Sequence, residues 1–360
     1  MIWSTVAIDQ IVFAMVLPVL PFLAKRYDAS PLQITALVSS YALAQFLLSP
    51  FLGGLSDKFG RKPILVISLF GSALGSLIVG FAGALPMLFV GRIVDGASGT
   101  ALISAQTTIT DMVAPKERAR YLGLMGSAFA VGFIVGPALS GLASLVDTRL
   151  PFFIAAGLAA INAFAAIIRL PETHPPGAST AGAASEDSGP FAVLRNAKQA
   201  MTPASWFYIG AFAACLLAFS AVEGGTFTLL TADRFNFTSS DVAWVFVMVG
   251  VILAAVQVLL VGPVNERFGI RGTAVIAMCL NVVGFTLTAL ARQVPLLLAG
   301  SAANATGQGL LRPTATAAIS NSVPPQSRGA AIGVLTSAQG AVRISGPLAA
   351  GALFQSVGDW

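Results

Sequence analysis

The stretch Gly53-Gly54-Leu55-Ser56-Asp57-Lys58-Phe59-Gly60-Arg61-Lys62-Pro63 is a short charged segment between two long apolar runs. The run that follows it, from Ile64 to Val79, contains no charged residue. About 20 such residues cross a bilayer as a helix, because a helix satisfies its own backbone amides where lipid offers them no partner. The stretch therefore predicts a tight connection between two membrane-spanning helices.

The composition extends this prediction to the whole chain. Of the 360 residues, 56% are hydrophobic and only 10% are charged, and the mean hydropathy is +0.83. A soluble domain has roughly a quarter of its residues charged, and an outer-membrane barrel shows alternating segments of about ten residues, so both classes are excluded. The apolar runs predict eleven spanning helices, near residues 4–24, 33–54, 63–82, 87–111, 120–145, 150–169, 205–230, 240–262, 272–291, 295–318 and 328–354.

The basic residues are distributed unevenly between the two sides of this predicted bundle. Twelve Lys and Arg residues fall in the connections on one side and five on the other. The positive-inside rule then places the twelve, and the N-terminus, in the cytoplasm. The net charge of +5 is thereby explained without nucleic acid as a partner. The first apolar run lacks a basic n-region and a small-residue cleavage site, so we expect a retained helix of a multi-pass inner-membrane protein.

Three motifs recur along the chain at a nearly constant offset. Two of them are repeated 210 residues later: Pro115, Arg118 and Gly123 recur as Pro325, Arg328 and Gly333, and Gly136, Pro137 and Gly141 recur as Gly346, Pro347 and Gly351. The third is repeated 209 residues later, with Asp57, Phe59 and Gly60 corresponding to Glu266, Phe268 and Gly269. Such a repeat predicts a duplicated bundle. We expect copies at 1–170 and 202–360, joined by a polar cytoplasmic linker at 171–201. The sixth helix has no second copy before Trp360, so a twelfth helix is expected to be missing.

The stretch 53–63 resembles the signature loop of the major facilitator superfamily. Gly91 to Gly99 is similar to that superfamily's fourth-helix motif with its buried arginine, and Gly132 to Gly141 to the fifth-helix motif of proton-coupled exporters. Asp9 with Met15 to Pro21 resembles helix one of the drug:proton antiporters, the tetracycline-efflux proteins in particular. The resemblance implies an all-α major facilitator fold of two six-helix bundles.

The resemblance also implies a conformational role for the residues of these motifs. In the superfamily the acidic residue of the signature loop, here Asp57, latches helix ends in one state, and the glycine–proline pair forms a hinge and seal. The residues implied are Gly54, Asp57, Gly60, Arg61, Gly136, Pro137 and Glu266. Two plainer interpretations stay open: a loop that only sets topology, and glycines that only let helices pack closely.

Six charged residues lie within the predicted spans, and a charge at the centre of a spanning helix costs a few kcal/mol unless function requires it. They are Asp9, Arg92, Asp95, Glu223, Arg312 and Arg343. The helical rise places Asp9 and Arg312 in the inner half of the bilayer and the other four in the outer half, so that each layer sums to zero charge. Arg92 and Asp95 share a helix face at i, i+3, and Asn304, Gln308 and Arg312 form an i, i+4 stripe. Static ion pairs are the alternative to proton or substrate binding, and an extra carboxylate at Asp95 would favour a cationic cargo or a second proton.

These features predict proton-coupled efflux of a small, partly hydrophobic molecule by alternating access, with a drug such as tetracycline as one candidate. Glu223, flanked by Phe219 and Phe227, is the first candidate proton site. The alternatives are an importer or sugar-type facilitator, and a truncated membrane protein that transports nothing. The sequence shows no metal spacing, phosphate loop or nucleophile–base–acid set, and Cys215 and Cys279 lie in apolar runs. We therefore expect no enzyme and no cofactor, but a monomer that binds substrate, protons and lipid.

Overall fold

The computed structural model describes residues 2–99, 105, 113, 115–170, 172, 201–323 and 328–357. Within them, the side chains of residues 57, 115, 116, 118–124, 203, 204 and 328–330 are not described. Every predicted span falls on helical chain, although the span at 87–111 is described only to residue 99. The predicted linker at 171–201, except for Glu172 and Met201, lies outside the described residues.

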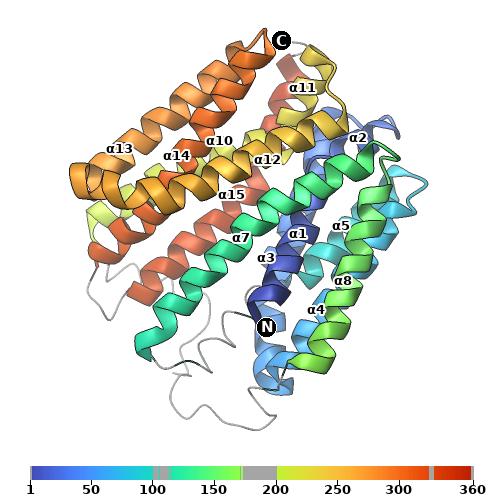
Figure 1. The fold of residues 1–360 in the computed structure, drawn as a ribbon, viewed down its shortest axis with the longest axis horizontal. Coiled ribbons are helices and arrows are strands. Elements are labelled where there is room, and N and C mark those ends of the chain that lie inside the picture. The colour runs from blue at the N-terminus through green and yellow to red at the C-terminus, as the bar shows by residue number, and fades with distance from the viewer. Residues whose placement is uncertain are drawn as a thin grey trace. The chain divides into compact units, whose positions relative to one another are not determined.

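The first sequence copy forms seven described helices. They are α1 (Ile2–Val16), α2 (Leu20–Lys25), α3 (Pro31–Phe59), α4 (Arg61–Gly80), α5 (Leu85–Ser98), α7 (Pro115–Ser144) and α8 (Leu150–Arg169). Helix α3 begins with a capping box, in which Ser30 Oγ accepts from the amide of Gln33 at 3.3 Å and Gln33 Oε1 accepts from the amide of Ser30 at 2.8 Å. Helices α5 and α8 both pack against α4 (Figure 1).

The second copy is helical throughout its described residues but is interrupted by two π-helical turns. Its elements are α10 (Pro203–Ala221), η1 (Val222–Thr226), α11 (Phe227–Phe235), α12 (Ser239–Ala255), η2 (Val256–Leu260), α13 (Val261–Leu290), α14 (Val294–Asn321) and α15 (Arg328–Val357). Seven stretches of the described chain are long and apolar enough to cross a membrane, and one of them, Ser239–Leu290, holds two of the predicted spans. The prediction of an all-α membrane protein is confirmed. The missing twelfth helix stays a prediction.

The described residues group into two compact units that do not follow the two sequence copies. Unit 1 draws on Met1–Ala178, Ala221–Val247 and Pro347–Trp360, and unit 2 on Ser179–Ser220 and Met248–Gly346. Two changes of unit fall at recognisable positions, since Ala221 directly precedes the π-helical turn η1 and Pro347 is a proline inside α15. The predicted division into bundles at 1–170 and 202–360 was based on the sequence repeat, and it stays a prediction.

The connection at 53–63 is tighter than we expected. Helix α3 continues through Gly53 and Gly54 to Phe59, and α4 begins at Arg61, so Gly60 alone separates them. Its φ of 105° lies in the region that favours glycine. A Cβ on Gly53 or Gly54 would meet nothing within 4 Å among the described residues, so the packing interpretation finds no support at these two glycines.

The structure repeats the duplication in three dimensions. Gly269, 209 residues after Gly60, also has a positive φ, of 68°. In unit 1 a Cβ on Gly75 would lie 2.8 Å from the carbonyl oxygen of Gly91, where α4 crosses α5. Two glycines of unit 2, each 209 residues later, make the same contact between α13 and α14: a Cβ on Gly284 would lie 2.8 Å from the Gly300 oxygen. Helix crossings of this closeness require glycine in both copies.

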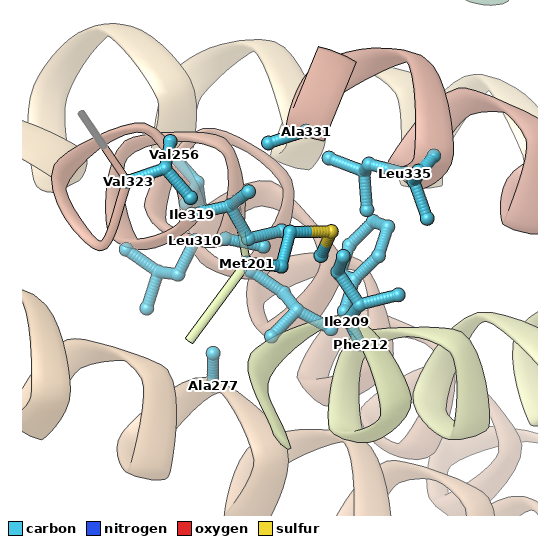
Figure 2. Close-up of a cluster of buried hydrophobic side chains, with 13 residues drawn as sticks. Met201, Ile209, Phe212, Val256, Ala277, Leu310, Ile319, Val323, Ala331 and Leu335 are labelled. Carbon is cyan, nitrogen blue, oxygen red and sulfur yellow. The ribbon is translucent and has the colours of Figure 1, made fainter. Parts of the chain in front are cut away.

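Unit 2 is held together by its own apolar core. Figure 2 shows Phe212 and Ile209 of α10 beside Leu335 of α15, with Leu310 and Ile319 of α14 in the same cluster. Each of these side chains is less than one tenth exposed. This core fixes the helices that carry the polar residues of the second copy.

Candidate functional site

A buried ion pair lies inside unit 1. Arg92 and Asp95, one turn apart on α5, are 2% and 6% exposed, and Arg92 Nη1 donates to Asp95 Oδ2 at 2.9 Å. Ser72 of α4 donates to the other carboxylate oxygen at 2.8 Å. Among the described residues, Arg92 Nε is buried without a hydrogen-bond partner. The predicted pairing of Arg92 with Asp95 on one helix face is therefore present, and Ser72 is a partner that the sequence pattern did not indicate.

Aromatic rings from three helices adjoin this pair. The Arg92 guanidinium lies over the ring of Tyr41 on α3, 4.4 Å from its centroid, which is within cation–π range. Phe13 of α1 is 5.3 Å from Tyr41 and 6.4 Å from Phe133 of α7, centroid to centroid. All three rings are half-buried, so part of each remains accessible. Together they form an apolar, flat-sided surface next to a buried charge.

Asp9 belongs to the same site. It lies on α1 one turn before Phe13, and its carboxylate is close enough to that of Asp95 to interact electrostatically. Gln10 Nε2 donates to Asp9 Oδ2 at 3.1 Å. The placement of Asp9 and Asp95 in opposite halves of the bilayer stays a prediction. Their interaction was not predicted, because residue counts along single helices ignore where neighbouring helices bring those residues together.

Unit 2 has neutral residues where unit 1 has its charged site. Asn281 and Asn304 follow Ser72 and Asp95 by 209 residues, and both are buried. Gln308 Nε2 donates to Asn281 Oδ1 at 2.8 Å. Asn304 Oδ1 is buried without a hydrogen-bond partner in the described part of the chain. The predicted stripe on α14 is thus buried at its first two positions, Asn304 and Gln308.

Two of the six predicted charges are exposed. Arg312 and Arg343 lie at positions that α14 and α15 turn away from the unit's interior. Arg312 nevertheless has an interaction with another group. The sequence could not distinguish buried from exposed arginines, since an arginine in an apolar stretch has the same neighbours in sequence whichever face of the helix it occupies.

Glu223 lies where its spanning helix is broken. It is the second residue of η1 and is half-buried, and the two residues after it, Gly224 and Gly225, have non-helical backbone angles. A Cβ on Gly224 would collide with the Pro347 side chain, so the break packs directly against α15 within unit 1. Glu223 interacts with another group. Its position at a helix break was not predicted, although the Gly-Gly pair was the signal for it.

The motif residues are placed as follows. Gly136 lets α7 approach α1, since a Cβ there would lie 2.7 Å from the Ile11 oxygen, and Pro137 follows it inside α7. The structure therefore supports the interpretation that Gly136 lets two helices pack closely, and the hinge role stays a prediction. Arg61 Nη1 donates to Ser56 Oγ at 3.5 Å, and Glu266 is exposed on α13. The Asp57 side chain lies outside the described residues, so its latch role stays a prediction as well.

Three consecutive residues, beginning with the last residue of α2, join several segments of unit 1, and none of these contacts was predicted. Lys25 Nζ pairs with Asp233 Oδ1 of α11 at 2.6 Å, and Arg26 donates to Thr148 Oγ1 at 2.8 Å. Tyr27 donates to the Ala82 oxygen at 2.5 Å and accepts from Arg149 at 2.8 Å. Of these three residues, Lys25 contacts the second sequence copy, through Asp233.

The fold and this buried site are those of a membrane transporter of one family. The model of the Major Facilitator Superfamily matches residues 2–232 and 223–360, so the chain belongs to this superfamily and is a multi-pass membrane protein. It is 33% identical over 364 residues to the class G tetracycline resistance protein of Vibrio anguillarum, covering 99% of this chain and 90% of that protein. It is 28% identical to multidrug resistance protein 2 of Bacillus subtilis (strain 168), covering 98% and 87%.

Solved structures agree on the fold. The crystal structure of the human organic anion transporter MFSD10 matches with a TM-score of 0.70 at 22% identity, covering 99% of this chain and 93% of that one. The nucleoside transporter NupG matches with a TM-score of 0.78 at 16% identity, covering 99% and 91%. The predicted superfamily is confirmed, and the relatives support drug efflux at the level of the family.

Proposed function

We propose that this protein exports a tetracycline-like molecule from the cytoplasm in exchange for protons. It does so as a monomer of the inner membrane with its N-terminus inside, and it leaves the substrate chemically unchanged. The observation that carries the proposal is the convergence of Asp9, Arg92 and Asp95 beside three half-buried aromatic rings in unit 1. The relatives named for tetracycline and multidrug resistance support the choice of cargo.

The charge balance of this cluster is what couples protons to substrate. The cluster contains one guanidinium, which pairs with Asp95, and two carboxylates, so its fully ionised form has a net charge of −1. A buried uncompensated charge is costly, so the cluster takes up either a proton or a positively charged part of the substrate. Proton and substrate then exclude each other. That exclusion is the requirement for exchange of one for the other across the membrane.

The aromatic rings supply the second half of recognition. Phe13, Tyr41 and Phe133 offer flat apolar surfaces, and stacking on such surfaces favours a planar, partly hydrophobic molecule. Phe13 is one helical turn from Asp9, so a single bound molecule can touch a ring and the carboxylate together. Glu223, on the broken helix of the second copy, is the second proton-site candidate.

The test is gradient-driven uptake of labelled tetracycline into inverted vesicles that are acidic inside. We expect uphill uptake by the natural protein and its loss in Asp9→Asn, because asparagine hydrogen-bonds but cannot carry the proton. Exchange of tetracycline without a gradient should survive. Asp28→Asn is the matched control, since Asp28 is exposed and its φ of 53° suits asparagine equally well.

Two results would count against the proposal. Full gradient-driven uptake by both Asp9→Asn and Asp95→Asn would remove the cluster from proton coupling. Tetracycline movement by the natural protein that ignores the pH gradient would favour a facilitator of the same fold.

A further inference from the structure

The first turn of α4 lacks a capping side chain of its own. A helix begins with amide groups that have no partner within the helix, and an N-cap side chain normally accepts from them. Here the N-cap position is Gly60, whose φ of 105° excludes most side chains and whose own atoms offer no cap. Because a glycine occupies the N-cap position, the first amide groups of α4 need a hydrogen-bond acceptor from another part of the chain.

Glu172 provides that acceptor from 110 residues further along the chain. Its Oε1 accepts from the Arg61 amide at 3.0 Å, and its Oε2 accepts from the Lys62 amide at 3.2 Å. A Cβ on Gly60 would lie 2.6 Å from Glu172 Oε2, so the carboxylate also fills the space that a side chain would occupy. A negative group at this end of a helix is favoured by the helix dipole.

The sequence places Glu172 there through the end of α8. That helix ends at Arg169, and Leu170 is 6% exposed in a cluster with Leu65 and Leu69 of α4. This apolar contact anchors the chain beside α4, and Glu172 follows two residues later. Among the residues that the structure describes, the corresponding break in the second copy makes no such contact, because a Cβ on Gly269 would meet nothing within 4 Å.

We propose that Glu172 is a positioning residue that holds the connection at Gly60 and ties it to the end of the sixth helix. In the sequence, the residues after Glu172 lead to the second copy of the bundle. The cap therefore attaches the α3–α4 connection to the start of the segment that links the two copies. Any rearrangement of the α3–α4 connection during transport then has to release or carry Glu172. Loss of the cap should lower turnover while leaving substrate affinity unchanged. This consequence rests on the transport function proposed above, whereas the cap itself does not.

Hydrogen–deuterium exchange of the purified protein tests the cap directly. Glu172→Ala removes both acceptors, and Glu172→Gln keeps one acceptor but no charge. We expect amide exchange in the peptide covering residues 58–66 to rise about tenfold in Glu172→Ala, less in Glu172→Gln, with no change at the centre of α8. Glu117→Gln is the control, because Glu117 is an exposed acid in the first turn of α7. Unchanged exchange in Glu172→Ala would overturn the proposal.

Tetracycline uptake separates the cap from its role in transport. We expect kcat to fall several-fold in Glu172→Gln, with KM unchanged and normal protein abundance. Faster exchange with natural kcat and KM would also overturn the proposal, because the cap would then be structural only. If the natural protein moves no tetracycline, the proposed function fails, and the exchange result still decides whether Glu172 caps α4.

Discussion

The crossing of α4 over α5 gives the sharpest prediction about the site. A Cβ on Gly75 would lie 2.7 Å from Asp95 Cβ and 2.8 Å from the Asp95 amide nitrogen. Carbon atoms in contact normally lie about 3.5–4.0 Å apart, so Gly75→Ala requires the two helices to separate by about 1 Å. Overpacking of this kind costs about 1–3 kcal/mol. The separation also displaces the carboxylate that pairs with Arg92.

The assay is the melting temperature of the purified protein in detergent, measured beside tetracycline transport. We expect Gly75→Ala to melt several degrees lower and to transport poorly. Gly157→Ala on α8 is the matched control, because a Cβ there meets nothing within 4 Å. Alanine improves helix propensity equally at both sites, so their difference isolates packing. Equal melting temperatures for the two variants would refute the close crossing. Gly284→Ala should lower the melting temperature in the same way in unit 2, because a Cβ on Gly284 would lie 2.6 Å from the Asn304 amide nitrogen.

Two further predictions concern residues that bring the second sequence copy into unit 1. Reversing either charge of the Lys25–Asp233 pair, as Lys25→Asp or Asp233→Lys, should lower transport several-fold without loss of abundance, because an exposed pair contributes at most about 1 kcal/mol to stability. The double reversal should recover transport, and a double variant as poor as the singles would show that the Lys25–Asp233 ion pair plays no part in transport. Glu223→Gln should abolish gradient-driven uptake while tetracycline still binds, measured as uptake beside equilibrium binding. Loss of abundance in place of this would identify Glu223 as a structural ion-pair member.

Most of the fold can be predicted from the sequence because the membrane imposes a simple physical rule. Long uncharged runs must be helices, and the constant offset that relates Gly60 to Gly269 identifies the duplication from the residues alone. The side of a helix on which a residue lies is harder to predict. Arg92 is buried and Arg312 is exposed, although both interrupt apolar runs.

Residues that act across helices are the ones that sequence reasoning misses. Ser72 and Tyr41 look like ordinary residues of their own helices, and only the packing of α3, α4 and α5 brings them to Arg92 and Asp95. Glu172 falls within the predicted polar linker, and its role was missed because its partners are backbone amides, which no residue pattern identifies. Long-range polar contacts of this kind follow from the fold and cannot be read from local patterns.

The unequal chemistry of the two copies has an electrical consequence. Asp9, Arg92 and Asp95 together have a net charge of −1 when ionised, whereas Asn281, Asn304 and Gln308 at the related crossing have none. Moving one elementary charge through the full membrane potential involves about 2.3 kcal/mol per 100 mV. Of these two polar clusters, only the one in unit 1 can respond to voltage. When a proton neutralises it, that response disappears, so the protonated and deprotonated forms of the transporter should differ in how strongly membrane potential drives their interconversion.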